Sequence, residues 1–150
     1  MFSWLFSDPL PVGSVAPDFT LLDDAGQQVS LASLRGKNLL LVFYPADNTP
    51  GCTKQLCQLR DNWGLLQSKD VQVFGVNPQS ATSHAAFRQE QKLPFPLLAD
   101  KGHKVTSLYN AGGLIVKRTV YLIGKDGKIK FAKRGAPTPH EALAAISTMR

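Results

Sequence analysis

The chain has 150 residues, 43% of them hydrophobic, and this length and composition suit one globular domain with its own core. The formal net charge of +6 comes from the last third, where residues 101–150 carry ten Lys and Arg against two Asp and Glu. Because charged and apolar residues alternate there, as in Lys128–Phe131, the pattern indicates a solvated strand face rather than a nucleic-acid site. From this pattern we expect no nucleic-acid partner. No apolar run is long enough to span a bilayer, so we expect no membrane partner either.

The first segment, MFSWLFSDPLPVG, lacks the basic start, the long apolar stretch and the cleavage site of a secretory signal. We therefore expect residues 1–150 to form a single domain in the cytoplasm, with residues 1–14 as an N-terminal extension. The aromatic residues of this extension are expected to pack onto the domain or onto a partner, and contact with a membrane surface is the alternative. These residues are Phe2, Trp4 and Phe6.

The first predicted elements are a hairpin, a short helix and a central strand. A strand at Asp18–Asp23 enters a hairpin with Gln28–Leu31, and Ser30 caps a short helix that ends at Gly36. The continuous apolar run Leu39–Tyr44 predicts a central strand that is buried on both faces.

The remaining elements alternate between helices and strands. Apolar residues at three- and four-residue spacing predict a helix from Cys52 to about Ser68. The elements predicted after it are a buried strand at Val71–Val76, a helix at Ser80–Lys92, a short strand within Leu93–Asp100, a helix at His103–Asn110, a hairpin at Thr119–Ala132 with its turn at Gly124–Gly127, and a terminal helix opened by the capping box Thr138–Glu141. This order indicates an α/β sandwich with a mixed central sheet flanked by helices, which is the thioredoxin-like architecture.

Both cysteines of the chain lie in the stretch TPGCTKQLC, directly after the predicted central strand. Thr49 suits the N-cap and Pro50 the first position of the following helix, so Cys52 falls in its first turn. Unpaired N–H groups and the positive end of the helix dipole favour an ionised sulfur at that position. An unperturbed thiol is only about 3% ionised at pH 7, so this environment predicts a nucleophile.

Cys57 lies five positions after Cys52, and this spacing predicts a switch. Residues five apart on an α-helix have Cα atoms about 8.6 Å apart, whereas a disulfide needs roughly 4.4–6.8 Å. The two sulfurs can therefore bond only if the first turns of the helix unwind. Two cysteines do not complete a four-thiolate zinc site, and two unrelated buried cysteines remain the alternative.

The segment FYPADNTPGCT resembles the active-site motif of the peroxiredoxins, Pro-x-x-x-Thr-x-x-Cys. Its three fixed positions hold Pro45, Thr49 and Cys52. The second cysteine five residues later is similar to that of the Q-type, or bacterioferritin-comigratory, subfamily. The resemblance extends from APDFTL near the start to RTVYLIGKDGKI in the last third.

This resemblance implies a thiol-dependent peroxidase that acts on hydrogen peroxide and organic hydroperoxides without a metal or other cofactor. Cys52 would attack a hydroperoxide oxygen and become a sulfenic acid, while Thr49 orients the peroxide and Pro45 shields the sulfur from water. Arg118 matches the second-site arginine of the family. Cys57 would then form a disulfide with Cys52, which thioredoxin or a similar thiol reductant would reduce. Q-type members also suggest a monomer.

The chemistry requires more than an ionised sulfur. Full ionisation of the thiol increases the rate at most about 30-fold over the unperturbed state. The remainder must come from groups that stabilise charge as the O–O bond breaks: the Thr49 hydroxyl, the Arg118 guanidinium and the backbone N–H of Cys52. Arg60 and Arg134 are the rivals for the role of Arg118.

Two features depart from the family pattern. Gln55 stands three residues after Cys52, where many relatives have Glu, so a hydrogen bond to the arginine can form but an ion pair cannot. The connection YNAGGLIVKR before the late strand is shorter than in many relatives. Other side chains are assigned no catalytic role: Phe43, Tyr44 and Trp63 are expected in the core, and His84, His103 and His140 at the surface.

Two other functions fit parts of the pattern. A thioredoxin-like thiol-disulfide oxidoreductase would favour a C-x-x-C pair in the first turn, whereas the second thiol here lies two residues further on. A redox sensor would use the unwinding of the helix to change a partner surface without sustained turnover.

Overall fold

The computed structural model describes residues 8–113 and 115–147 of the chain. Seven strands form one sheet in the order β2-β1-β5-β4-β3-β6-β7. The strands are β1 (Thr20–Asp23), β2 (Gln28–Ser30), β3 (Asn38–Phe43), β4 (Val71–Asn77), β5 (Leu97–Ala99), β6 (Thr119–Ile123) and β7 (Ile129–Arg134). The α-helices are α1 (Pro50–Asp61), α2 (Trp63–Ser68), α3 (Ala81–Gln91), α4 (Lys104–Leu108) and α5 (Pro139–Ser147), and two 3₁₀ turns lie at η1 (Ala32–Leu34) and η2 (Lys101–His103).

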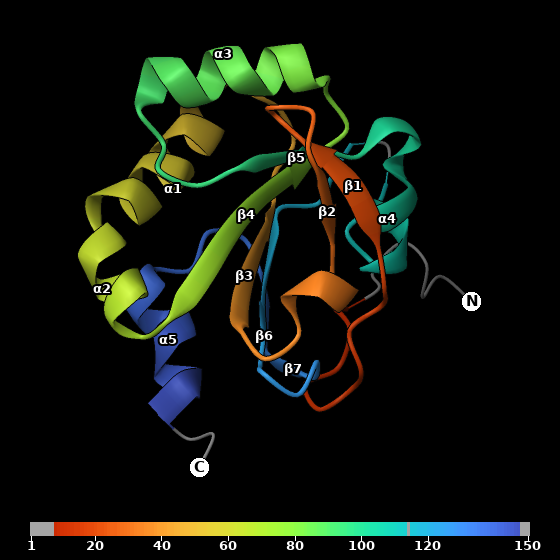
Figure 1. Cartoon of the computed structure of the whole chain (residues 1–150), viewed down its shortest axis with the longest axis vertical. Helices are drawn as coiled ribbons and strands as arrows, with labels where there is room; N and C mark the ends of the chain where they lie inside the picture. The colour runs from red at the N-terminus through yellow and green to blue at the C-terminus, as the bar shows by residue number, and fades with distance from the viewer. Residues whose placement is uncertain (1–7, 114, 148–150) are drawn as a thin grey trace.

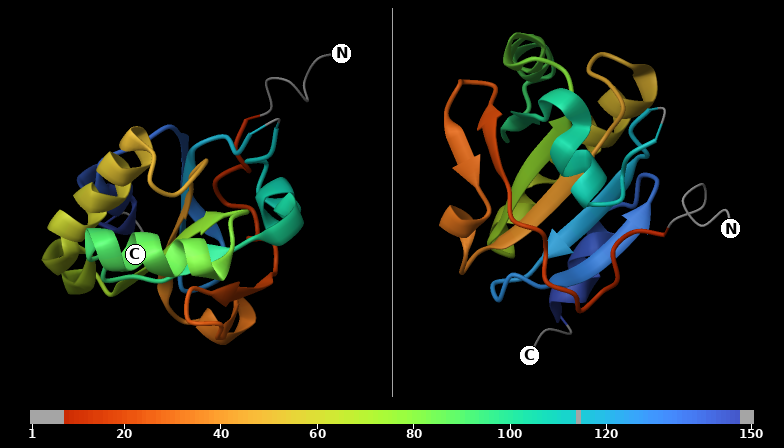
Figure 2. Two further views of the ribbon diagram at one scale, coloured as in Figure 1. Left: turned by 90° about the horizontal axis from the view of Figure 1, so that it is seen from above. Right: turned by 90° about the vertical axis from the view of Figure 1, so that its right-hand side faces the viewer.

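The sheet is mixed, as the sequence predicts. β3 is parallel to β4, and β4 is parallel to β5, whereas β3 is antiparallel to β6 and β6 to β7. The helices α1, α2 and α5 lie on one side of the sheet and α4 lies on the other (Figures 1 and 2). This three-layer arrangement is the thioredoxin-like fold.

The central strand β3 supplies side chains to both cores. Leu40 and Val42 pack into the core that includes residues of α1, α2, α3 and α5. Leu39, Leu41 and Phe43 pack into the other, which includes residues of α4 and β1. All six residues of β3 are buried, which explains why the strand reads as a continuous apolar run rather than an alternating one.

The predicted long helix after Cys52 is interrupted. α1 ends at Asp61, and Asn62 adopts φ −111° and ψ 23° before α2 begins. The Asn62 side chain donates to the carbonyl of Gln58 at 2.8 Å, and its backbone N–H bonds the carbonyl of Leu59. Such local bonds from Asn compete with the helical pattern, so the apolar spacing continues across the break while the backbone does not.

The N-terminal extension and the C-terminal helix α5 are both held by hydrogen bonds. Phe2, Trp4 and Phe6 lie outside the described residues, so their expected packing stays a prediction. From residue 8 onwards the extension is bound to the domain: the Leu10 N–H donates to the Tyr121 hydroxyl at 2.9 Å, and Leu10 packs against a core. At the other end, Thr138 caps α5 by accepting the Glu141 N–H at 3.1 Å.

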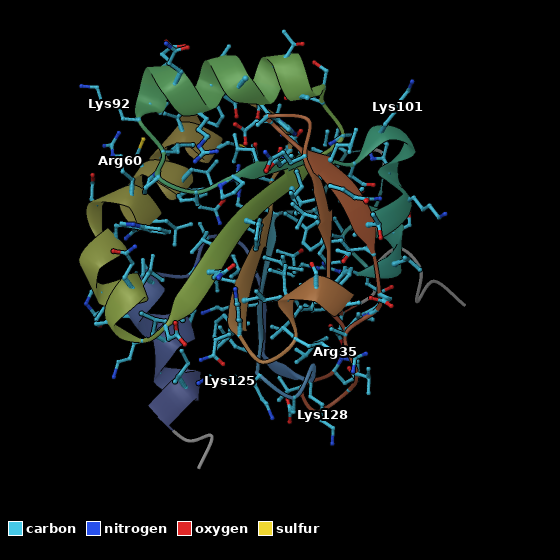
Figure 3. All side chains as sticks on the ribbon, viewed as in Figure 1. Arg35, Arg60, Lys92, Lys101, Lys125 and Lys128 are labelled. Atoms are coloured by element: carbon cyan, nitrogen blue, oxygen red, sulfur yellow. The ribbon has the colours of Figure 1, made fainter. Side chains whose placement is uncertain are left out.

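Basic side chains lie on several separate parts of the surface. Lys92, Lys101 and Lys128 lie on separate parts of the periphery and point away from the domain (Figure 3). In β7 the buried Ile129 lies between the exposed Lys128 and the half-buried Lys130, as expected for a strand with one solvated face. In the described part of the chain, no helix has both the length and the apolar character needed to cross a membrane.

Candidate active site

The candidate site forms at the carboxyl end of the central strand. Phe43 ends β3 and pairs with Thr119, the first residue of the antiparallel strand β6. Arg118 directly precedes β6, so it lies at the same edge of the sheet as the loop at residues 45–49 that leads from β3 into α1. Strand pairing thus brings Arg118 to Cys52 across 66 positions of the chain.

Cys52 is a buried thiol in the first turn of α1, with 1% of the residue exposed. Nη2 of Arg118 donates a hydrogen bond to Sγ of Cys52 at 3.2 Å. Cys52 also lies in the first turn of the helix, close to the positive end of the helix dipole. A guanidinium and a helix N-terminus both stabilise negative charge, so this position suits a nucleophilic sulfur.

Gln55 holds the other arm of the guanidinium. Nη1 of Arg118 donates to Oε1 of Gln55 at 2.6 Å, and Gln55 lies one turn after Cys52 on the same face of α1. The side chain is buried, and its Nε2 has no hydrogen-bond partner among the described atoms. The predicted hydrogen bond between Gln55 and Arg118 is therefore present. Because the amide is neutral, it adds no negative charge to offset the positive charge of the guanidinium beside the sulfur.

Thr49 and Pro45 flank the site on the loop between β3 and α1. Thr49 occupies the N-cap with extended backbone angles, and Pro50 takes the first helical position as predicted. The Thr49 hydroxyl, however, donates to the Ala46 carbonyl at 3.0 Å and does not cap the helix. This bond turns the hydroxyl back into its own loop and fixes its direction. Pro45 is half-buried beside the fully buried Tyr44.

Cys57 lies apart from this charged cluster. It is half-buried, and its Sγ contacts Oε1 of Gln91, at the end of α3, at 3.6 Å. Arg60 donates to the Gln91 carbonyl at 2.6 Å. Both cysteines are free and α1 is continuous from Pro50 to Asp61, so the structure represents the form with separated sulfurs.

The predicted surface position of His84 is wrong. His84 in α3 is fully buried, with Nδ1 2.7 Å from Oδ2 of Asp47 and Nε2 3.0 Å from the Leu98 carbonyl. Asp47, in the loop between β3 and α1, is buried as well. Nothing in the polar sequence around His84 signals its burial, because its partner lies 37 positions earlier in the chain. His140 is exposed and His103 half-buried.

The rival arginines bond elsewhere. Arg60 contacts Asp61 and the end of α3, and Nη1 of Arg134 donates to the Thr119 hydroxyl at 2.7 Å. Within residues 8–113 and 115–147, no group of three or more His, Cys, Asp and Glu side chains is arranged to hold a metal ion.

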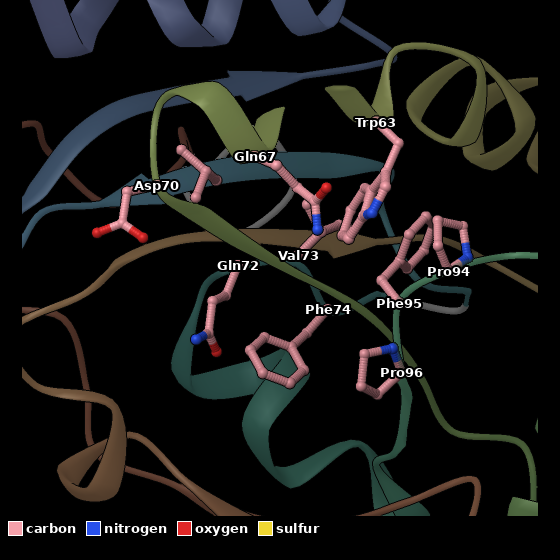
Figure 4. A pocket seen from close by; sticks show the side chains of 10 residues that line it. Trp63, Gln67, Asp70, Gln72, Val73, Phe74, Pro94, Phe95 and Pro96 are labelled. Carbon is pink, nitrogen blue, oxygen red and sulfur yellow. The ribbon is translucent and has the colours of Figure 1, made fainter. Parts of the chain in front are cut away.

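A separate groove of about 380 Å³ lies beside α2 and β4. Its lining includes Trp63, Gln67, Phe74, Pro94, Phe95 and Pro96 (Figure 4). The Trp63 and Phe95 ring centroids are 5.9 Å apart, and the half-buried Trp63 both packs against the core, as expected, and forms a wall of this groove. None of Cys52, Thr49 or Arg118 lines it, so the groove is distinct from the candidate site.

Comparison with known proteins gives consistent matches. The model of the AhpC/TSA family matches residues 12–132. The chain is 42% identical over 123 residues to the chloroplastic peroxiredoxin Q of Triticum aestivum, covering 79% of this chain and 57% of the relative. It is 40% identical over 131 residues to the putative peroxiredoxin bcp of Coxiella burnetii, covering 80% of this chain and 85% of the relative. The chain thus spans little more than half the length of the chloroplastic relative.

The fold also matches solved structures. The structure of peroxidoxin BcpB from Mycobacterium tuberculosis superposes with a TM-score of 0.85 at 29% identity, covering 93% of this chain and 97% of that one. A structure of Xanthomonas campestris peroxiredoxin Q gives a TM-score of 0.79 at 24% identity, covering 87% and 88% of the two chains.

Proposed function

The chain belongs to the AhpC/TSA family, with peroxiredoxin Q and bcp proteins among its relatives, and on this premise we propose that it is a thiol-dependent peroxidase. The observation that carries the proposal is the hydrogen bond from Arg118 to the buried sulfur of Cys52, at the N-terminus of a helix. The substrates proposed are hydrogen peroxide and organic hydroperoxides.

In the first step, the Cys52 thiolate attacks the terminal oxygen of the hydroperoxide. The S–O bond forms as the O–O bond breaks, so the sulfur is oxidised to a sulfenic acid and the peroxide is reduced. The leaving hydroxide or alkoxide takes a proton from solvent and departs as water or alcohol. Arg118 stabilises the charge that develops on the breaking O–O bond, and Gln55 keeps its guanidinium in place.

In the second step, Cys57 attacks the sulfenic acid of Cys52. An S–S bond forms, and the sulfenic oxygen leaves as water after protonation. The intact helix keeps the two Cα atoms about 8.6 Å apart, so its first turns must unwind before this bond can form. Unwinding also removes Cys57 from Gln91 and Cys52 from Arg118.

A dithiol reductant of the thioredoxin type would complete the cycle. Its two thiols are oxidised to a disulfide as the Cys52–Cys57 bond is reduced, and α1 can then re-form. The monomeric state and the cytoplasmic location expected from the sequence stay predictions.

Stopped-flow oxidation with hydrogen peroxide and with a bulky organic hydroperoxide tests the proposal. We expect Cys52 to react at least a thousandfold faster than free cysteine, and thioredoxin with its reductase to support continuous NADPH consumption. Reaction no faster than free cysteine would contradict peroxidase activity and favour the thiol-disulfide oxidoreductase. Fast oxidation without turnover would favour the redox sensor.

A further inference from the structure

Asp47 lies in the middle of the loop between β3 and α1, yet its side chain is only 1% exposed. Oδ1 accepts hydrogen bonds from the Tyr44 hydroxyl at 2.6 Å and from Nδ2 of Asn77 at 3.2 Å. Oδ2 accepts from the Ser83 hydroxyl at 2.7 Å and lies 2.7 Å from Nδ1 of His84. A carboxylate has about four acceptor positions, and here all four face a partner.

The contacts of His84 require two hydrogens: one on Nε2, and one on either Nδ1 of His84 or Oδ2 of Asp47. Nε2 lies 3.0 Å from the Leu98 carbonyl, which can only accept, so Nε2 carries a hydrogen. A second hydrogen must lie between Nδ1 and Oδ2, because two lone pairs would repel each other at 2.7 Å. Burial raises the pKa of Asp47, but hydrogen bonds from His84, Tyr44 and Ser83 outweigh it and leave the pKa below its usual value. This second hydrogen bridges Nδ1 of His84 and Oδ2 of Asp47 and ties α3 to the loop.

These contacts join three elements beneath the loop. Tyr44 follows β3, Asn77 ends β4, and Ser83 and His84 lie in the first turn of α3. The loop is also held through its backbone, because the Asp47 N–H donates to Oε1 of Gln79 at 2.5 Å. Burial, followed by the charge of Asp47, raises the pKa of the Tyr44 hydroxyl, so this group remains a donor.

We propose that Asp47 and His84 are positioning residues for the reaction of Cys52 with peroxide. They fix the loop at residues 45–49, which ends at the N-cap Thr49, and thereby fix the position of the Thr49 hydroxyl relative to Cys52. Neither residue touches the peroxide. The inference rests on the proposed peroxidase function and names a second support for its site, formed by other residues than Gln55 and Arg118.

Fixation of the loop matters because donors that stabilise a transition state must be in place before the reaction. A displacement of about 1 Å in a reacting group can lower a rate about a hundredfold. Thr49 lies two residues after Asp47, and Cys52 lies three residues further on. If the contacts of the Asp47 carboxylate are lost, the Thr49 hydroxyl, which is proposed to orient the peroxide, is displaced as well, because only a very short stretch of backbone separates the two residues.

The cluster also lies outside the helix that must unwind. None of the four side chains that contact the Asp47 carboxylate belongs to α1 (Pro50–Asp61). The cluster can therefore persist while Cys52 moves towards Cys57, and it gives the loop a fixed position from which α1 re-forms after reduction.

The experiment compares two reactions of Cys52 in single-turnover measurements. Oxidation by hydrogen peroxide depends on the oriented donors, whereas alkylation by iodoacetamide depends only on an accessible, ionised sulfur. In Asp47→Asn one carboxylate oxygen becomes an NH₂ group, which cannot accept the hydrogen bonds that this oxygen receives. We expect its peroxide rate to fall tenfold to a hundredfold, with the alkylation rate unchanged within about twofold.

A milder series covers the case in which Asp47→Asn does not fold. Ser83→Ala removes one of the four contacts of the carboxylate, and we expect its peroxide rate to fall about threefold to tenfold. Ser83→Thr keeps a hydroxyl and should recover most of the wild-type rate. Thr82→Ala, at the exposed neighbouring position of α3, should react as the wild type does. Circular dichroism confirms that each variant is folded.

The outcomes separate this inference from the proposed function. Folded variants that react with peroxide as fast as a fast wild type would overturn the positioning role alone. Equal losses in the peroxide and alkylation rates would also overturn it, because they indicate general damage to the site. A wild-type protein that reacts no faster than free cysteine would overturn the peroxidase function and this inference together.

Discussion

The two cysteines of α1 are held in contrasting ways, one in its first turn and the other past its middle. Near its start, Cys52 is 1% exposed and accepts a hydrogen bond from the charged Arg118, which belongs to the sheet edge. One and a half turns later, Cys57 is half-buried and contacts the neutral amide of Gln91, at the end of another helix. One helix therefore presents two thiols that differ in burial and in the charge of the group that contacts the sulfur.

The difference shows how one helix can serve two steps. The first thiol needs a fixed charge beside it while a peroxide reacts, and strand pairing supplies that charge from the rigid centre of the fold. The second thiol needs to leave its place once the first is oxidised. A single sulfur contact of 3.6 Å to an uncharged amide is weak enough to break at little cost.

The largest expected effect comes from removing each sulfur in turn. Cys52→Ser should abolish peroxide reduction, because no other group in the site forms a sulfenic acid. Cys57→Ser should complete one reaction with peroxide and then accumulate Cys52 as sulfenic or over-oxidised acid. Mass spectrometry of the oxidised proteins checks both. Repeated turnover in Cys57→Ser with thioredoxin as the reductant would contradict the division of roles between the two cysteines.

The next effect concerns the positive charge beside the Cys52 sulfur. Arg118→Met should lower the peroxide rate about a hundredfold, equivalent to about 3 kcal/mol of transition-state stabilisation. Arg118→Lys keeps the charge but cannot bond both Sγ and Gln55, so we expect a loss of about tenfold. Stopped-flow oxidation measures both. The neighbouring Lys117→Met is the control and should stay within twofold of the wild type, and an equal loss in this control would assign the effect to general charge.

The same contrast shows what sequence can predict. The first turn around Cys52 is determined locally, because Thr49, Pro50 and the preceding apolar strand lie within a few residues of it. The central strand β3 is recognisable because both of its faces are buried. The order of strands and helices therefore predicts the fold, and the local motif predicts the thiol.

Residues brought in by tertiary pairing leave no such signal. Arg118 reaches Cys52 only because β6 pairs with β3, so only the family resemblance could single it out. His84 reads as a polar helix residue, and its burial follows from Asp47, which lies in a distant loop. The break at Asn62 escapes prediction because the apolar spacing continues from α1 into α2.

A smaller effect is expected at the Cys57 end. Gln91→Ala removes the amide that contacts Sγ and keeps the backbone carbonyl that holds Arg60. Loss of this weak bond, about 0.7 kcal/mol, should speed disulfide formation about threefold and leave the first oxidation unchanged. Gln89→Ala, at an exposed position of the same helix, is the control. Rapid acid quenching followed by thiol counting separates the two steps, and a slower disulfide step in Gln91→Ala would show that Gln91 guides Cys57 rather than retains it.

An effect of similar size tests whether a neutral partner for Arg118 matters. Gln55→Glu places a carboxylate at the 2.6 Å contact with Nη1, so the guanidinium becomes part of an ion pair and a second negative charge lies one turn from Sγ. Both changes oppose a negative sulfur, and we expect the peroxide and iodoacetamide rates at neutral pH to fall together by about threefold. This parallel loss distinguishes the variant from Asp47→Asn, in which only the peroxide rate should fall. An unchanged or faster peroxide rate in Gln55→Glu would mean that the glutamine serves only to orient the guanidinium, and that the charge at the Cys52 end tolerates an acidic neighbour.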